Sequence, residues 1–286
     1  MMNRIVIGTA NFNQKYGLTK SSIKKISSDK KLLNYINENV QYIDTADSYK
    51  LSKNIIKKLR FKEKKIITKY KLPYKKTSLF VKNFKKKVTK DLNTFGVKKL
   101  EAVLFHNVND LNNYQGKKLL KILKNLKNEK KIKKIGVSIY TLKDADMVLK
   151  IFMPDIIQLP LNLFNQKFIE SKYIDLFKKK KITIQVRSIF LQGLLLKNLN
   201  DLKKINLNKK LFKNIKKFND WCINKKVTRL QACIHFIKNL KIADLITIGF
   251  ENEENLKEIK AVLKKNLKIK FLKLNINEKI LDPRKW

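Results

Sequence analysis

The chain has 286 residues, and 43% of them are hydrophobic, which supplies apolar material for a buried core and excludes a disordered chain. Its 67 Lys and Arg outnumber 23 Asp and Glu, giving a formal net charge of +44. Only five of these basic residues are arginine, the side chain that proteins reading bases and phosphates tend to use. We therefore interpret the charge as lysine on solvated helix surfaces, with a polyanion or an acidic membrane as the alternative partner.

Short apolar runs rich in β-branched residues recur along the chain and alternate with longer segments of helical period. We predict eight strands, at residues 4–8, 42–44, 65–68, 102–106, 134–138, 156–159, 182–187 and 245–249. The clearest helical segments are 117–131 and 252–265. Eight strand-then-helix units in a chain of this length predict a single α/β domain over residues 1–286, folded as a (β/α)8 TIM barrel.

Two segments exceed what the barrel itself needs. Residues 192–226 are longer than one connection between a strand and its helix, so we expect a loop over the barrel mouth and an extra helix there. Residues 269–286 follow the last helical segment, and we expect this C-terminal extension to pack against the barrel, with Trp286 as its anchor.

The two cysteines, Cys222 and Cys233, are too few for a disulfide framework, and we expect buried thiols in a reducing compartment. No apolar run approaches the roughly 18 residues that a membrane span needs. The first residues lead directly into a strand-like run without a signal-peptide pattern. These features predict a cytoplasmic protein with no membrane partner.

Side chains that can ionise or hydrogen-bond stand at the ends of the predicted strands, where TIM barrels carry their chemistry. Asp44, Lys69 and His106 end three neighbouring strands, and Tyr49 follows Asp44 by five residues. A lysine ammonium beside a tyrosine favours the phenolate, and an aspartate beside the lysine keeps it charged and in place. A histidine across the mouth could orient or polarise a substrate carbonyl. By contrast, we interpret Asp47 as a turn or capping residue.

Several short motifs occur in order along the predicted strands: IGTANF, IDTADSY, ITK, LFH, GVS, QLPLN and RSIFLQGLL. Through them the chain resembles the aldo-keto reductases over essentially its whole length. The resemblance implies that Asp44, Tyr49, Lys69 and His106 are the catalytic tetrad. It implies an NAD(P)H-dependent oxidoreductase that reduces a carbonyl to an alcohol by hydride transfer, with Tyr49 as general acid.

The resemblance also implies a cofactor site and no metal. Ser138 and Gln158 would hold the nicotinamide carboxamide, Ser188, Gly193 and Leu194 would meet the pyrophosphate, and the last strand and helix would bind the adenosine end. The full set of implied cofactor-binding residues is Gly8, Thr9, Ser138, Gln158, Arg187, Ser188, Gly193, Leu194, Gly249, Glu251, Asn255 and Glu258.

The chain departs from the family pattern at several of these motifs. Lys50 and Lys53 follow the tyrosine where glycine and glutamate are usual, and Ile139 replaces an asparagine that shares the carboxamide. Arg187 stands where an aromatic ring often stacks on the nicotinamide. Family habit favours NADP as cofactor, but Glu251 stands where a basic residue often binds the 2′-phosphate, so NAD is the alternative.

Other functions remain open on the sequence alone. A relative that has lost catalysis could keep the cofactor site as a binding or regulatory module, and the charge could serve nucleic-acid binding, although no specific nucleic acid is expected. The lysine-rich loops and Arg187 favour an anionic or sugar-like carbonyl substrate, selected by loops 70–80, 107–116 and 192–226. We expect a monomer or a homodimer. We expect His235 to be a core or interface histidine.

Overall fold

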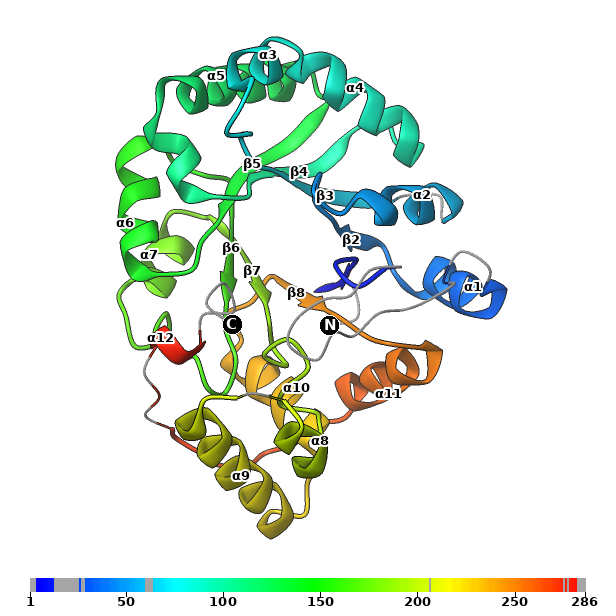
Figure 1. The fold of residues 1–286 in the computed structure, drawn as a ribbon, viewed down its shortest axis with the longest axis vertical. Coiled ribbons are helices and arrows are strands. Elements are labelled where there is room, and N and C mark those ends of the chain that lie inside the picture. Colours follow the sequence, from blue (N-terminus) through cyan, green and yellow to red (C-terminus); the bar gives the residue numbers. More distant parts are fainter. Residues whose placement is uncertain are drawn as a thin grey trace.

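We describe the protein from a computed structural model, which places residues 4–12, 26, 29–59, 64–205, 207–274, 276 and 278–281. Eight parallel strands close into a barrel in chain order, because the first strand pairs with both the second and the eighth. Figure 1 shows these strands in the middle of the molecule and the helices around them. The predicted single-domain (β/α)8 barrel is therefore confirmed.

Each strand lies within two residues of its predicted bounds, because buried β-branched runs identify parallel strands well. The strands are β1 (Ile5–Gly8), β2 (Tyr42–Asp44), β3 (Lys65–Tyr70), β4 (Leu100–Phe105), β5 (Ile132–Ser138), β6 (Ile156–Pro160), β7 (Thr183–Arg187) and β8 (Leu245–Ile248).

Helices follow the strands around the outside of the barrel. They are α1 (Lys30–Asn39), α2 (Lys50–Lys58), α3 (Thr77–Lys82), α4 (Phe84–Phe95), the 3-10 helix η2 (Val108–Asn112), α5 (Tyr114–Asn128), α6 (Leu142–Ile151), α7 (Tyr173–Lys179), α8 (Leu199–Lys203), α9 (Lys209–Asn224), α10 (Arg229–Leu240), α11 (Glu253–Lys264) and α12 (Glu278–Leu281). The predicted helix 117–131 begins earlier, at Tyr114, because the side chain of Asn113 accepts a hydrogen bond from the Gly116 amide and starts the helix there.

The inside of the barrel has an apolar lower layer and a polar upper layer. The buried apolar side chains that pack together there are Val6, Ile67, Ala102, Leu104, Ile156 and Leu245. Side chains two residues further along a strand point to the same side. Thus Ile67 is followed by Lys69 and Ile156 by Gln158, so the strands deliver polar groups to their carboxyl ends.

The two extra segments pack beside the barrel. Helices α8 and α9 lie within residues 192–226, and Phe218 of α9 meets Phe164 edge to face, with ring centroids 5.8 Å apart. In the C-terminal segment, Phe271 contacts Trp221 of α9 and Phe236 of α10, with centroids 6.3 and 5.5 Å apart. The predicted anchor Trp286 lies outside the described residues.

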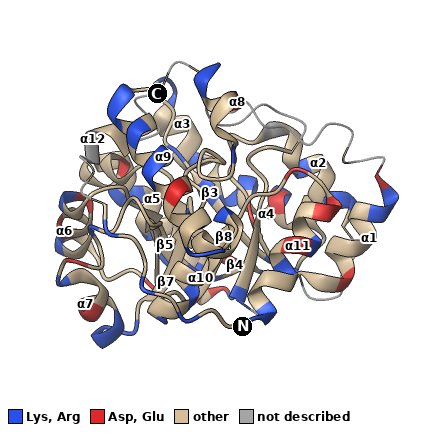
Figure 2. Ribbon diagram, turned by 90° about the horizontal axis from the view of Figure 1, so that it is seen from below, with Lys and Arg blue, Asp and Glu red and all other residues tan. Residues whose placement is uncertain are grey.

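Figure 2 shows Lys and Arg along α1, α6, α7 and α8, which lie on different sides of the molecule, so the positive charge is not confined to one element. Among the helices of the described ranges, none is long and apolar enough to cross a membrane. Cys222 and Cys233 are free thiols and both are buried, as is His235 on α10.

Close packing between strands makes Gly136 of β5 a test of the fold. A Cβ at this position would lie 2.0 Å from the Ile156 carbonyl oxygen and 2.8 Å from Cδ2 of Leu104. We predict that Gly136→Ala lowers the free energy of unfolding by about 1–3 kcal/mol or more, because backbone must move to admit the methyl group. Gly249→Ala is the control, since its Cβ would meet nothing within 4 Å. Equal urea midpoints for both variants and the parent would contradict the prediction.

Candidate active site

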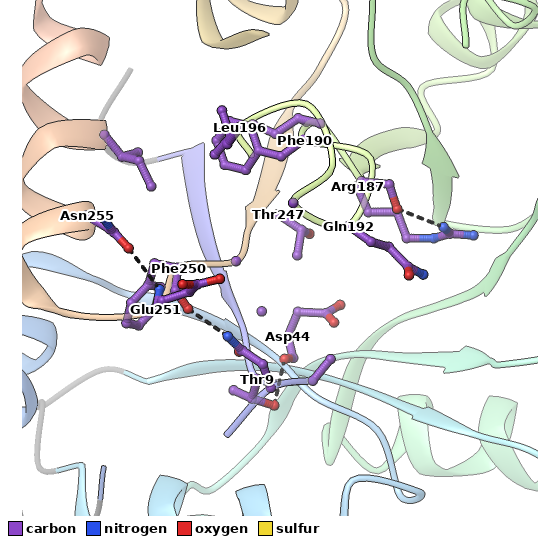
Figure 3. Close-up of a pocket in the computed structure, with 18 of the residues that line it drawn as sticks. Thr9, Asp44, Arg187, Phe190, Gln192, Leu196, Thr247, Phe250, Glu251 and Asn255 are labelled. Carbon is purple, nitrogen blue, oxygen red and sulfur yellow. Dashed lines mark hydrogen bonds between the residues drawn. The ribbon is translucent and has the colours of Figure 1, made fainter. Parts of the chain in front are cut away.

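A pocket of about 500 Å³ opens at the carboxyl ends of the barrel strands. In Figure 3, Glu251 and Asn255 lie on one side of it, Arg187 and Gln192 lie on the other, and Asp44 lies between them. The predicted site residues that line the pocket are Gly8, Thr9, Asp44, Tyr49, Lys69, His106, Ser138, Gln158, Arg187, Ser188, Gly193, Gly249, Glu251, Asn255 and Glu258. Leu194 is not among them, because its side chain is fully buried in the core.

An ion pair between Asp44 and Lys69 forms the floor of the pocket. Lys69 Nζ donates to Asp44 Oδ1, and the two residues are only 3% and 5% exposed. Burial lowers the pKa of Lys69, and the carboxylate of Asp44 opposes that shift. Buried charges are tolerated when they are paired and fully hydrogen-bonded, so the remaining lone pairs of Asp44 need donors too.

Two glutamines supply those donors from the far side of the barrel. The side-chain amide of Gln158 donates to Asp44 Oδ2 at 2.7 Å, and that of Gln185 donates to the same oxygen at 3.0 Å. Gln185 also reaches Thr247 Oγ1 at 2.8 Å, while its own Oε1 is buried without a protein partner. Gln185 is not among the predicted site residues, although it stands two residues before Arg187 and therefore on the same side of β7.

His106 and Tyr49 lie next to the ion pair. Their rings meet edge to face, with centroids 6.2 Å apart and planes at 88°. Lys69 Nζ lies 5.8 Å from the centre of the Tyr49 ring. Burial, helped by the nearby charge of Lys69, lowers the pKa of His106 from 6.5 to about 4, so the imidazole is neutral at pH 7.

Hydrogen bonds within a short turn place Tyr49 after β2. The Asp47 amide donates to the Lys69 carbonyl at 2.8 Å, and the Tyr49 amide donates to the Ala46 carbonyl at 3.0 Å. Ser52 Oγ donates to the Tyr49 carbonyl at 2.7 Å. The turn thus forms without a glycine after Tyr49, and α2 begins at Lys50.

Asp47 does more than the sequence analysis assigned to it. It lies in the turn, as predicted, but its side chain does not cap α2, whose N-cap is Tyr49. Instead its carboxylate forms ion pairs with Lys53 at 2.9 Å and Lys87 at 2.8 Å. The sequence did not indicate the ion pair with Lys87, because this lysine lies forty residues away on α4.

Arg187 lies on the wall of the pocket. Its guanidinium stacks on the Tyr140 ring, with Cζ 4.1 Å from the ring centre, and Nη2 donates to the Ile139 carbonyl at 3.2 Å. Nη1 donates to Ser188 Oγ at 3.3 Å. Tyr140, which the sequence analysis did not single out, therefore fixes the orientation of the arginine.

The loop after β7 has an unusual backbone. Ser188, Leu191 and Gln192 all have left-handed φ values, of 59°, 48° and 55°, and Gly193 has a φ of 88°. Only glycine adopts this region without strain, and strained residues that persist are concentrated at ligand sites. This loop and the N-terminal end of α10 add Gln192, Lys197, Thr228 and Arg229 to the pocket wall.

The opposite end of the pocket lies at the start of α11. The side chain of Asn252 caps this helix by accepting from the Asn255 amide at 2.8 Å, and Asn255 Oδ1 accepts from the Glu251 amide at 3.3 Å. Nearby, Asn11 Nδ2 donates to the Phe250 carbonyl at 2.7 Å, which ties the segment after β1 to the segment after β8.

The pocket residues fit an elongated ligand with polar groups at both ends. The Asp44–Lys69 pair, Ser138 and Gln158 supply polar groups along the lining, and the start of α11 supplies a helix terminus, which suits phosphate or hydroxyl groups. Within the described residues, no three His, Cys, Asp or Glu side chains come together as a metal site would require.

The aldo/keto reductase family model matches residues 4–276 of the chain. Among solved structures, the chain is similar to the aldo-keto reductase AKR11C1 from Bacillus halodurans in its holo form, with 14% identity, coverage of 93% of this chain and 88% of that chain, and a TM-score of 0.72. It is also similar to the glycerol dehydrogenase AKR11B4 from Gluconobacter oxydans, with 18% identity, coverage of 93% and 88%, and a TM-score of 0.67. At these identities the likeness shows the shared fold. No curated protein matches the chain.

The lowered pKa of His106 makes a pH prediction. The unfolded chain takes up this proton near the ordinary pKa and the folded chain only near pH 4, so folding loses stability as the pH falls between 6.5 and about 4. We predict a His106 titration midpoint of about 4 by NMR, assigned with His235→Gln because the chain has only two histidines.

Lys69→Met should raise the His106 midpoint, because it removes the nearest positive charge, whereas Lys71→Met, a weaker contributor, should change it less. A midpoint near 6.5 in the parent would contradict the assignment of a neutral imidazole.

Proposed function

The chain belongs to the aldo/keto reductase family, and on that premise we propose that it reduces the carbonyl group of a small molecule to an alcohol. The hydride would come from a nicotinamide dinucleotide, and Tyr49 would give the proton as general acid. The observation that carries the proposal is the buried Asp44–Lys69 ion pair on the pocket floor beside Tyr49.

The ion pair gives Tyr49 the environment that a proton donor needs. A tyrosine hydroxyl has a pKa of about 10 in water and is a poor acid at pH 7. A lysine ammonium nearby stabilises the phenolate that remains after proton transfer, and it acts strongly because the surroundings exclude water. Asp44 would hold that ammonium in position, with Gln158 and Gln185 holding Asp44.

His106 would orient the substrate. A neutral imidazole can donate one hydrogen bond to a carbonyl oxygen without placing a second full positive charge beside Lys69. Its edge-to-face contact with Tyr49 brings both side chains to the same part of the pocket. A carbonyl oxygen held between them would be positioned for protonation by Tyr49.

The cofactor, when bound, supplies the hydride. We propose that Gly8, Thr9, Ser138 and Gln158 would hold its nicotinamide end, together with Arg187 on the wall. Ser188 and Gly193, which lie in the loop after β7 and have positive φ values, would bind the pyrophosphate through their backbone. The adenosine end would lie against Gly249, Glu251, Asn255 and Glu258. Leu194 would act only by packing under the loop, since its side chain is buried.

Charges on the pocket bear on the choice between NADP and NAD. Lys197 and Arg229 line it and support NADP, which we retain as the proposed cofactor. Glu251 and Glu258 also line it and favour NAD, because carboxylates bind ribose hydroxyls and repel a phosphate. The positive charge of Lys257 does not offset these two carboxylates, because Lys257 is paired with Glu253 and does not line the pocket.

The positive charges near the pocket also bear on the class of substrate. Arg187 on the pocket wall and the lysine-rich loops support an anionic or sugar-like carbonyl substrate. We propose that the protein works in the cytoplasm as a monomer or homodimer. Loops 70–80, 107–116 and 192–226 would select the substrate, because they follow strands at the open end of the barrel.

NADPH and NADH oxidation against a panel of aldehydes, ketones and sugar carbonyls tests the proposed activity. We predict turnover by the parent and a fall of at least about a hundredfold in kcat for Tyr49→Phe, since general acid catalysis typically contributes that much. Cofactor affinity, measured by fluorescence, should stay within about twofold of the parent. Cofactor binding without turnover of any carbonyl by the parent would support a binding or regulatory module instead.

The carboxylates at the adenosine end make a separate prediction about affinity. Glu251→Gln combined with Glu258→Gln should tighten NADP binding relative to NAD by about tenfold, or about 1.4 kcal/mol, because it removes repulsion of the 2′-phosphate. Glu253→Gln is the matched control, since Glu253 pairs with Lys257 and does not line the pocket. An unchanged ratio of dissociation constants in the double variant would show that the 2′-phosphate binds elsewhere.

A further inference from the structure

A second network of polar and charged side chains connects the segments on either side of Tyr49 in the chain to β3 and α4. The reaction outlined above does not use it. It joins the turn after β2, the first turns of α2, strand β3 and helix α4. Its members are Asp47 in the turn, Lys53 on α2, Tyr70 on β3, and Lys87 and Asp91 on α4.

Lys53 is the centre of this network. Its Nζ donates to both carboxylate oxygens of Asp91, at 2.8 and 3.0 Å, and to Asp47 Oδ1 at 2.9 Å. The Tyr70 hydroxyl donates to Asp91 Oδ2 at 2.5 Å, and Lys87 forms the outer ion pair with Asp47. The three donors of the lysine ammonium are thus directed at two carboxylates.

The inner part of the network is largely withdrawn from water. Asp91 is 4% exposed and the Lys53 side chain 16%, whereas the side chains of Asp47 and Lys87 are 28% and 32% exposed. Burial alone would lower the pKa of Lys53, but hydrogen bonds and charge from Asp91 and Asp47 outweigh it and raise the pKa. Removing one partner of a buried pair is far more disruptive than losing a surface pair, so the Lys53–Asp91 contact is the part of the network whose loss should matter most.

Along the chain, Tyr49 lies between Asp47 and Lys53, which are both members of the network. On one side is Asp47, whose amide donates to the Lys69 carbonyl. On the other is Lys53, in the first turn of α2, and Tyr49 itself is the N-cap of that helix. At the start of α2, Ser52 donates to the Tyr49 carbonyl through both its amide and its hydroxyl, and the first turn contains no acidic residue. These local contacts fix the backbone of Tyr49, and the network of Lys53 and Asp91 ties the same segment to α4 and β3.

We propose that Lys53 and Asp91 form a positioning clamp that holds the 45–49 turn and the start of α2 against β3, and so keeps Tyr49 beside Lys69 and His106. The inference rests on the proposed role of Tyr49 as general acid. It gives the three hydrogen bonds of Lys53 a role in the site. Lys53 and Asp91 are positioning residues, since neither lines the pocket.

Lys53→Met and Asp91→Asn test the clamp, with kcat, KM and cofactor affinity measured for each. Each variant should lose about tenfold to a hundredfold in kcat, since a misplacement of about 1 Å can cost that much. KM and the cofactor dissociation constant should stay within about threefold. The pH profile of kcat should also shift, because Tyr49 would no longer be held at a fixed distance from Lys69. Lys53→Arg, which keeps the charge, should recover most of the activity.

Lys127→Met is the control for loss of a lysine–aspartate pair away from the pocket. Lys127 Nζ binds both oxygens of Asp155 at 2.6 Å, just before β6 and therefore at the opposite end of the barrel from the pocket. This pair is more exposed than Lys53–Asp91, so removing it should change thermal stability little and leave kcat and its pH profile unchanged. If Lys53→Met also leaves kcat and its pH profile unchanged, the proposal is overturned.

A second readout does not depend on turnover. The edge-to-face contact between Tyr49 and His106 predicts a nuclear Overhauser effect between their rings, assigned with Tyr49→Phe. The effect should be present in the parent and in Lys127→Met and be lost or weakened in Lys53→Met. Its persistence in Lys53→Met would overturn the clamp. If the parent reduces no carbonyl, the proposed function fails, and the ring contact still decides whether the clamp exists.

Discussion

The buried ion pair between Asp44 and Lys69 is the constraint on which the upper half of the barrel depends. A buried carboxylate paired with one lysine is tolerated when other donors hydrogen-bond its remaining lone pairs. Asp44 meets this condition with hydrogen bonds from Lys69, Gln158 and Gln185, which come from β3, β6 and β7. The polar upper layer of the barrel is therefore a connected set of side chains around one carboxylate, above an apolar layer that fills the rest.

The same pair determines the properties of its neighbours. Burial, together with its lysine, lowers the pKa of His106 and keeps the imidazole neutral, so an uncharged hydrogen-bonding ring lies beside the charged pair. Lys53 and Asp91 form a second, partly buried pair between α2 and α4. Tyr49 lies beside the first pair, and along the chain it stands between Asp47 and Lys53 of the second network.

The sequence predicted the barrel and the cluster of Asp44, Lys69 and His106 because both depend on local patterns, whereas the other predicted pocket residues came from the family resemblance. Buried strands are short β-branched runs, and the residues that end them must face the mouth. What escaped prediction depends on contacts across the chain. Gln185 looks like one polar residue in an apolar strand until its distance to Asp44 is known. The partner of Asp47 on α4, and the approach of Lys197 and Arg229 to the pocket, arise from packing that no local pattern encodes.

The contacts of Asp44 also bear on how the protein folds. Its partners stand 25, 114 and 141 residues away along the chain, so the full set forms only after β7 has joined the sheet. Contacts of such high sequence separation form late, because the entropy of closing long loops must be met first. During synthesis, Asp44 and Lys69 emerge long before either glutamine. A ribosome-bound half-barrel therefore holds two charges that must stay hydrated until the second half of the chain arrives to enclose them.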